Sequence, residues 1–299
     1  MSNNFKIDFI GIGAAKSGTT WIARMLEEHP NVCMSEPKEV AYFNELHRQG
    51  KQYFYRDKEK SMYNPDFHKP LSWYARHFAH CKHGQKKGEF SPVYFYDEKA
   101  AAEIKKHFPD AKLIVCLRNP IDRAYSDYWM IRETFKLEKS SFEEALQNDP
   151  LHIEKGLYFK QLSRYLKLFP REQIHIIFYD DIKEKPENTI RALYAFLGVN
   201  SSFIPRGVLR RSNWSKKARF KGIVQRMDLA VRFLTAARLG FVVRVLKYCG
   251  INRLILAAST TRFSYPPMEL ATREYLREVF KDDIAQLSRF LGRNLSNWQ

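Results

Sequence analysis

The chain of 299 residues is poor in the residue types that build disulfide scaffolds, collagen-like repeats and disordered segments. Its four cysteines are far apart and form no CxxC pair, so neither a disulfide framework nor a zinc knuckle is predicted; they are Cys33, Cys81, Cys116 and Cys249. Glycine and proline number only 13 each, which excludes collagen-like and low-complexity chains. Apolar residues make up 44% and aromatic residues 14% of the chain, which is enough for a packed core.

The sequence also lacks a long uninterrupted apolar run. The longest candidate, Leu229 to Ile255, is interrupted by Arg232, Arg238, Arg244 and Lys247, whereas a membrane-spanning helix needs about 18 predominantly apolar residues. The first residues, MSNNFKIDFIGIG, have no apolar segment of the kind found in secretory signals. Together with unpaired cysteines, these features predict a soluble protein of a reducing compartment, and therefore a cytoplasmic location.

Acidic residues are too few to balance the basic ones. The chain has 33 acidic and 50 basic residues, a formal net charge of +17, which favours anionic partners. Most of the excess lies in Arg206 to Arg253, which holds thirteen lysines and arginines against a single acidic residue, Asp228. Three interpretations of this segment stay open: helices packed on the sheet with solvated basic faces, a groove for an anionic saccharide, or peripheral association with an anionic membrane.

Apolar runs alternate with amphipathic segments along most of the chain. Four runs are predicted strands: Phe5–Ile12, Lys86–Phe90, Ala111–Leu117 and Gln173–Phe178. The predicted helices are Thr19–Glu28, Leu71–His80, Asp97–His107, the segment that Asn119 and Pro120 begin, Gly156–Phe169 and Pro186–Leu197. This order predicts an α/β fold with a central parallel sheet flanked by helices. We expect a single domain over residues 1–299, with a basic helical segment at about 206–262 and a C-terminal helix at about 268–291.

The first predicted strand leads into the segment GIGAAKSGTTW, residues 11–21, which opens a helix. Successive backbone N–H groups at such a turn, with the positive end of a helix dipole, form a cradle for an anion. Lys16 adds a cation, and three hydroxyl donors follow: Ser17, Thr19 and Thr20. A strand–helix turn without a ligand is the alternative. The pattern differs from a Walker A loop because Lys16 precedes Gly18 by two positions.

The strand Ala111–Leu117 ends in Arg118, where a P-loop ATPase usually has an aspartate that helps to hold Mg²⁺. The carboxyl end of a parallel strand is where open α/β sheets bind ligands, and a guanidinium there can hold a phosphate. Ser126 lies two turns into the next helix and is placed to donate to the same group. A structural salt bridge and a surface serine are the alternatives. With Lys16, these residues predict a ligand that is anionic at both ends, with no metal between.

At this point the sequence resembles the sulfotransferases that use 3′-phosphoadenosine 5′-phosphosulfate (PAPS). KSGTTW, residues 16–21, is similar to their 5′-phosphosulfate loop, and LRNPIDRAYSDYW, residues 117–129, resembles their 3′-phosphate motif. PKEVAYF (37–43), GEFSPVYF (88–95) and the segment from Gly156 to Ile182 are similar to the heparan-sulfate (glycosaminoglycan) branch and its bacterial relatives. The C-terminal FLGRNLSNW fits the same pattern.

The resemblance implies a role for each matching residue. Those that would bind the 5′-phosphosulfate are Lys16, Ser17, Gly18, Thr19 and Thr20. Trp21 would lie against the adenine, with a core aromatic as the alternative, and Arg118 and Ser126 would bind the 3′-phosphate. Glu39, in the KE-x-x-F motif, would be the general base, with a solvent-facing loop glutamate as the alternative. Tyr158 falls in the GxY element of the family.

The implied reaction is transfer of a sulfuryl group from PAPS to a hydroxyl or amine of a saccharide or other acceptor, without a metal. Lys16 would stabilise the charge that develops on the leaving phosphate, and the product would be adenosine 3′,5′-bisphosphate (PAP). Two positions depart from the heparan-sulfate pattern: Phe90 stands in place of a lysine and Ala41 in place of a histidine. The alternatives are a P-loop-type kinase that uses ATP and a basic, non-enzymatic nucleic-acid-binding protein. No signature of specific nucleic-acid binding is present, and the oligomeric state is left open.

Overall fold

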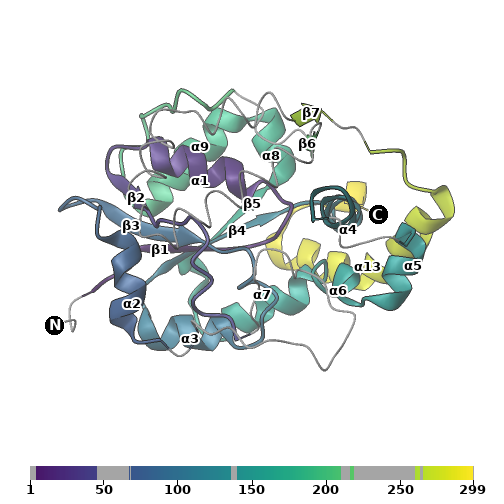
Figure 1. Cartoon of the computed structure of the whole chain (residues 1–299), viewed down its shortest axis with the longest axis horizontal. Helices are drawn as coiled ribbons and strands as arrows, with labels where there is room; N and C mark the ends of the chain where they lie inside the picture. The colour runs from purple at the N-terminus through teal and green to yellow at the C-terminus, as the bar shows by residue number, and fades with distance from the viewer. Residues whose placement is uncertain are drawn as a thin grey trace, which may run out of the picture.

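The computed structural model describes residues 5–45, 67, 69–135, 140–209, 216–218, 260–262 and 265–298 (Figure 1). A five-stranded sheet of order β2-β3-β1-β4-β5 forms its centre, and every neighbouring pair is parallel. The strands are β1 (Phe9–Gly13), β2 (Val32–Met34), β3 (Lys86–Phe90), β4 (Lys112–Leu117) and β5 (Ile174–Phe178). The predicted α/β fold, with a central parallel sheet flanked by helices, is confirmed.

Consecutive side chains of β4 enter two different apolar clusters, because successive residues of a strand point to opposite faces of the sheet. Leu113, Val115 and Leu117 belong to one cluster. Ile114 and Cys116 belong to the other. All five are 0% exposed. The run AKLIVCL therefore forms a strand that is buried on both faces, as its continuous apolar character predicts.

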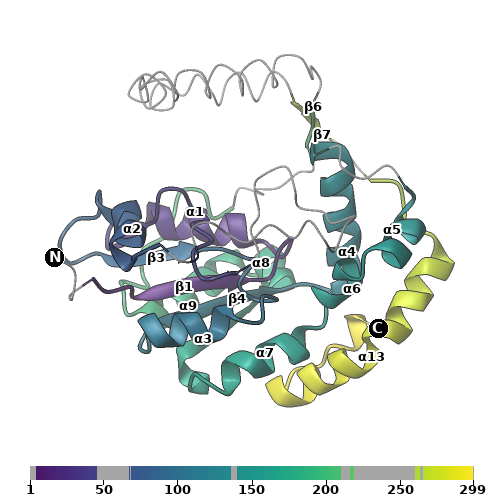
Figure 2. The ribbon, with the colours of Figure 1, turned by 60° about the horizontal axis from the view of Figure 1, so that its bottom comes forward.

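Helices cover both faces of the sheet (Figures 1 and 2). One face carries α1 (Thr19–Glu28), α8 (Tyr179–Glu184) and α9 (Pro186–Leu197). The opposite face, where the larger apolar cluster lies, is covered by six helices of the described ranges. They are α2 (Leu71–Ala75), α3 (Ala100–His107), α4 (Pro120–Trp129), α5 (Phe142–Asn148), α7 (Tyr158–Leu166) and α13 (Leu270–Leu291). The short helix α6 (Leu151–Glu154) lies between α5 and α7 in the chain, and β6 (Lys216–Ala218) pairs antiparallel with β7 (Thr260–Arg262).

The predicted helices and strands agree best with the structure where a few neighbouring residues in the sequence mark their ends. The helices at Thr19–Glu28 and Pro186–Leu197 have the predicted bounds, and Gly198 ends the second in a left-handed conformation. The first strand begins at Phe9 instead of Phe5. Strand β2 was not predicted, because three residues are too few to show a periodic pattern.

Most of the basic segment at about 206–262 lies outside the described residues, so its predicted helices stay a prediction. The C-terminal helix α13 is 22 residues long. It runs beside α4, α5 and α7 in Figure 2. Within the ranges given above, no helix combines the length and the apolar character that crossing a membrane requires.

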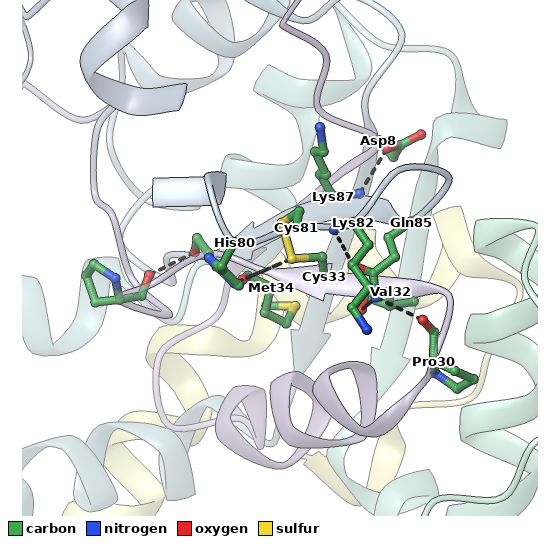
Figure 3. The surroundings of a disulfide bond; sticks show 12 residues. Asp8, Pro30, Val32, Cys33, Met34, His80, Cys81, Lys82, Gln85 and Lys87 are labelled. Atoms are coloured by element: carbon green, nitrogen blue, oxygen red, sulfur yellow. Dashed lines mark hydrogen bonds between the residues drawn. A yellow bond between two sulfur atoms is a disulfide. The ribbon is translucent and has the colours of Figure 1, made fainter. Parts of the chain in front are cut away.

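Cys33, in β2, and Cys81 form a disulfide (Figure 3). They are 48 positions apart in the sequence, and the fold brings their Cα atoms to 5.6 Å, an ordinary separation for a disulfide. The prediction of four unpaired cysteines is therefore wrong for this pair, because tertiary folding, and not CxxC spacing, brings the two together. Cys116 is a buried free thiol, and Cys249 lies outside the described residues.

Candidate active site

The loop between β1 and α1 is shaped to present backbone N–H groups. Gly18, the residue before α1, has a φ of 94°, in the left-handed region that favours glycine. Within the described part of the chain, no side chain caps this helix, so the N–H groups of its first residues stay available to a ligand. Thr19 is buried and Thr20 half-buried at the start of the helix. The strand, turn and helix of the predicted anion cradle are all present.

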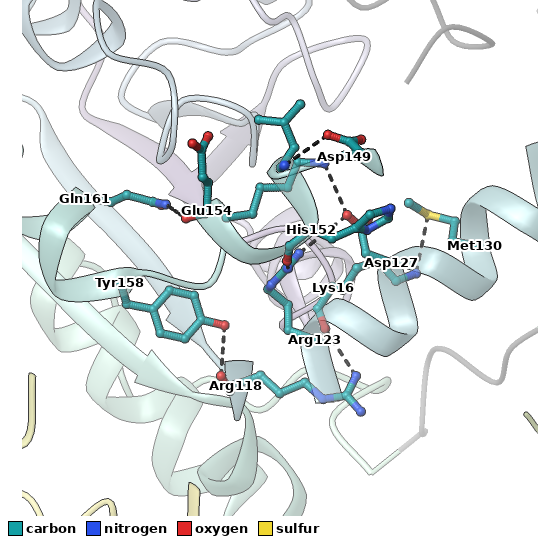
Figure 4. A network of polar contacts seen from close by, with 12 residues as sticks. Lys16, Arg118, Arg123, Asp127, Met130, Asp149, His152, Glu154, Tyr158 and Gln161 are labelled. Atoms are coloured by element: carbon teal, nitrogen blue, oxygen red, sulfur yellow. Dashed lines mark hydrogen bonds and ion pairs between the residues drawn. The ribbon is translucent and has the colours of Figure 1, made fainter. Parts of the chain in front are cut away.

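The Lys16 side chain lies among polar residues of α4 (Figure 4). Its Nζ is 3.4 Å from the Sδ of Met130, which is only a weak acceptor. Burial lowers the pKa of Lys16, Arg118 and Arg123 lower it further, and Asp127 opposes them. An anion bound here would compensate a cation that the protein has partly removed from water.

Arg118 follows β4 directly and lies beside the phosphate loop. Its guanidinium donates a hydrogen bond of 3.4 Å to the backbone carbonyl of Lys16. It also lies over the Tyr179 ring, 4.9 Å from the ring centroid. Because β1 and β4 are neighbouring parallel strands, their carboxyl ends bring the two predicted cations together.

Ser126 lies on α4, the helix that follows Arg118 in the chain. The helix begins as predicted: Asn119 Oδ1 accepts hydrogen bonds from the backbone N–H groups of Ile121 and Asp122, and Pro120 is the first helical residue. Ser126 is 7% exposed. It precedes Met130, the neighbour of the Lys16 ammonium, by four positions, a spacing that places both on one helical face.

Tyr158 connects α7 to the end of β4. Its hydroxyl donates to the carbonyl of Arg118 at 2.9 Å, and burial raises the pKa of this tyrosine to about 12, so it stays a donor. The Ser17 hydroxyl is also buried, lies near the Tyr158 phenol, and makes no hydrogen bond of normal geometry with the described residues. A buried hydroxyl of this kind fits a loop whose missing partner is an anion.

A buried ion cluster supports this site, and the sequence motifs did not reveal it. Asp127 lies 3.5 Å from Arg123 and 3.2 Å from Lys155, and all three side chains are almost fully buried. Burial alone would raise the pKa of Asp127, but Lys155 and Arg123 hold it well below its usual range. The four-residue spacing of Arg123 and Asp127 on a helix was a usable signal. The contribution of Lys155 depends on tertiary folding.

Glu39 lies on the loop after β2, on an exposed stretch. Its Oε1 forms an ion pair of 2.8 Å with Lys38 Nζ, and 44% of its side chain is exposed. In the region that the structure covers, it makes no hydrogen bond to the phosphate loop. Its assignment as the general base therefore stays a prediction.

Two of the residues that the motifs drew attention to, Trp21 and Phe90, are core residues by their burial. Trp21 is 4% exposed and belongs to the apolar cluster beneath α1, which is the alternative given for it above, so its adenine contact stays a prediction. Phe90 is 0% exposed, and its ring lies so close to Gly11 that a Cβ there would approach it to 2.2 Å. The lysine-to-phenylalanine departure at this position therefore extends the core.

Comparison with known proteins identifies the family of the chain. A family model described as "Sulfotransferase domain" matches residues 6–221. A sulfotransferase structure from Alicyclobacillus acidocaldarius superposes with a TM-score of 0.67 at 26% identity and covers 99% of both chains.

Three curated relatives are longer than the part of them that this chain matches. The membrane-associated sulfotransferase kil1 of Dictyostelium discoideum is 27% identical over 68% of this chain and 59% of its own. The bifunctional heparan sulfate N-deacetylase/N-sulfotransferase 3 of Mus musculus is 27% identical over 97% of this chain and 31% of its own. The heparan sulfate glucosamine 3-O-sulfotransferase 5 of Mus musculus is 29% identical over 63% of this chain and 52% of its own. The chain spans 31% to 59% of the length of these relatives. Its match to the family model shows that it belongs to the sulfotransferase domain family.

Proposed function

We propose that this protein transfers a sulfuryl group from PAPS to a hydroxyl or amine of a saccharide-type acceptor. The observation that carries the proposal is the contact between Arg118 and Lys16 at the carboxyl ends of two adjacent strands. Two cations in this relation suit one small ligand with two anionic groups. PAPS carries a 5′-phosphosulfate and a 3′-phosphate on one adenosine, and membership of the sulfotransferase family supports it as the donor.

In the proposed reaction, the acceptor oxygen or nitrogen forms a bond to sulfur while the bond between sulfur and the 5′-phosphate oxygen breaks. The acceptor proton passes to the Glu39 carboxylate, and PAP leaves. Negative charge builds on the leaving phosphate, where Lys16 and the N–H groups at the start of α1 would stabilise it. Arg118 and Ser126 would hold the 3′-phosphate, and Tyr158 would keep the backbone of Arg118 in place.

We propose that the reaction needs no metal ion, because a guanidinium stands where a P-loop ATPase has its Mg²⁺-binding aspartate. Sulfuryl transfer in the presence of excess EDTA is the expected result. Transfer that requires Mg²⁺ would contradict this part of the proposal.

The curated relatives named for heparan sulfate support a saccharide as the acceptor. The net charge of +17 favours a saccharide that is anionic. The cytoplasmic location stays a proposal that rests on the sequence, and the Cys33–Cys81 disulfide counts against it because disulfides are rare in reducing compartments. The peripheral membrane association is a second proposal that rests on the sequence. Flotation with anionic and neutral liposomes tests the second, because binding through a basic segment depends on lipid charge.

Two measurements test the proposed function. Transfer of radiolabelled sulfate from PAPS to a panel of saccharides, lipids and phenols is expected, with saccharides as the acceptors. Stabilisation against thermal unfolding is expected with PAP in the absence of Mg²⁺ and not with Mg·ATP. Stabilisation by Mg·ATP alone would favour the kinase alternative.

A further inference from the structure

The loop that carries Glu39 is attached to β3 on one side of this residue by strand-like pairing. The Ser35 N–H donates to the Gly88 carbonyl at 2.9 Å, and the Phe90 N–H donates to the Lys38 carbonyl at 3.1 Å. These bonds place the backbone up to the residue before Glu39. Beyond Glu39, side chains take over the attachment.

Three consecutive backbone N–H groups directly after Glu39 donate to side chains of β3 and of the segment after it. The bonds are Val40 to Glu89 Oε2 at 3.1 Å, Ala41 to Ser91 Oγ at 3.0 Å and Tyr42 to Tyr94 Oη at 2.8 Å. Ala41 has a φ of 54°, which a non-glycine residue adopts at a cost. Such a conformation persists where the surroundings hold it.

Glu89 organises these side chains. It is 0% exposed and accepts hydrogen bonds from the hydroxyls of Ser91 at 2.6 Å, Tyr94 at 2.8 Å and Tyr74 at 2.8 Å. A hydroxyl has one proton, so a hydroxyl that donates to Glu89 turns its lone pairs elsewhere. For Ser91 and Tyr94, those lone pairs accept the N–H groups of the loop. The carboxylate therefore sets the direction of both hydroxyls.

The charge state of Glu89 depends on the same set of donors. Burial raises the pKa of Glu89, and the hydrogen bonds from Ser91, Tyr74, Tyr94 and the Val40 N–H lower it. Loss of a donor would therefore favour the protonated acid, which donates one hydrogen bond and cannot accept all four. The network holds the loop only as a complete unit.

We infer that Glu89 is a positioning residue of the reaction, which acts through the loop to hold Glu39 at the acceptor side of the site. The inference rests on the proposed role of Glu39 as the base. Among the described residues the Glu39 carboxylate is paired with Lys38 alone and is 44% exposed, so its location follows from its backbone and not from packing. The hydrogen bonds that fix the backbone directly after Glu39 converge on Glu89.

Glu89→Gln is the direct test, because the amide has nearly the same shape but presents an NH₂ group to hydrogen-bond donors. The expected kcat is lower by about 10- to 100-fold, as for a displaced reacting group. The KM for PAPS and the Kd for PAP should stay at wild-type values, because the nucleotide site lies on other segments.

A double-mutant cycle with Glu39→Gln separates positioning from general damage. The single change Glu39→Gln should lower kcat by about 10²- to 10⁴-fold. If Glu89 acts through Glu39, the double variant is no slower than Glu39→Gln alone. Losses that multiply would show that Glu89 acts independently and would overturn the inference.

Asp283→Asn is the matched control for loss of a buried carboxylate. Asp283 accepts hydrogen bonds from the N–H groups of Phe159 and Lys160 at the start of α7, away from the Glu39 loop. Any loss of kcat in this variant should multiply with that of Glu39→Gln.

If Glu89→Gln does not fold, Ser91→Ala replaces it in the cycle, because this change keeps the Glu89 carboxyl group and removes one hydrogen bond to the loop and one to Glu89. Absence of sulfuryl transfer by the wild type would overturn the proposed function and this inference with it. An active wild type whose Glu89 and Ser91 variants keep full kcat overturns the inference alone.

Discussion

The guanidinium of Arg118 donates a hydrogen bond to the backbone carbonyl of Lys16, across 102 positions of the sequence. This contact places the delocalised positive charge of the Arg118 guanidinium against the phosphate loop, which carries the Lys16 ammonium. The planar guanidinium can hold a phosphate through two parallel hydrogen bonds, so Arg118 is suited to bind one anionic end of the ligand.

Arg118→Ala should weaken the binding of PAP by about 10- to 100-fold and change the binding of AMP by less than about twofold, because a charged hydrogen bond contributes about 1.5–3 kcal/mol. AMP lacks the 3′-phosphate that Arg118 is proposed to hold. Titration calorimetry with both nucleotides is the measurement, and Arg289→Ala, on the exposed side of α13, is the control. Equal losses for PAP and AMP would show that Arg118 does not bind the 3′-phosphate.

Lys16→Ala should fold and lower kcat by about 10²- to 10³-fold, the usual cost of removing one group that stabilises developing charge. Folding should be retained because, among the described residues, the hydrogen bond of the Lys16 ammonium goes to the weak acceptor Met130, and because burial lowers the pKa of Lys16, so that its removal relieves desolvation. Single-turnover sulfuryl transfer is the measurement, with Lys281→Ala on α13 as the control. Wild-type turnover in the Lys16 variant would exclude the proposed role.

The sheet and the phosphate loop could be predicted because their signals are local. The apolar run before Arg118 specifies a buried strand, and Gly18 specifies the left-handed turn before α1. That Lys16 and Arg118 meet follows from one topological fact, the parallel pairing of β1 and β4. The sequence therefore indicated that Lys16 and Arg118 lie close together, and their binding of the nucleotide stays a prediction.

The supporting residues could not be predicted, because each depends on segments that only folding brings together. Glu89 accepts hydrogen bonds from Val40 and Tyr74, which precede it by 49 and 15 positions. The partner of Cys33 is 48 positions away. A lone glutamate within a strand, or a cysteine in a three-residue strand, has no pattern in the sequence that identifies such a partner.

Cys81→Ser should lower the free energy of unfolding by about 2–4 kcal/mol, since a disulfide mainly restricts the unfolded chain. Cys33 and Cys81 join β2 to the segment after α2. Urea unfolding without reductant is the measurement. A reductant should destabilise the wild type by the same amount and leave the Cys81 variant unchanged. A wild type that is insensitive to reductant would show that the bond is not formed.

The stability of the protein should fall as the pH is lowered from about 6.5 to 4, in part because of His175. Burial, with a smaller effect from Arg171, lowers the pKa of His175 to about 4, and the ring stacks on Phe196. The unfolded chain, in which a histidine has a pKa of about 6.5, binds more protons than the folded one in this interval, so stability rises with pH there. The contribution of His175 is complete above pH 6.5 and amounts to at most about 3 kcal/mol. His175→Leu should flatten this part of the curve in urea unfolding measured from pH 4 to 8, and an unchanged slope would contradict the assignment.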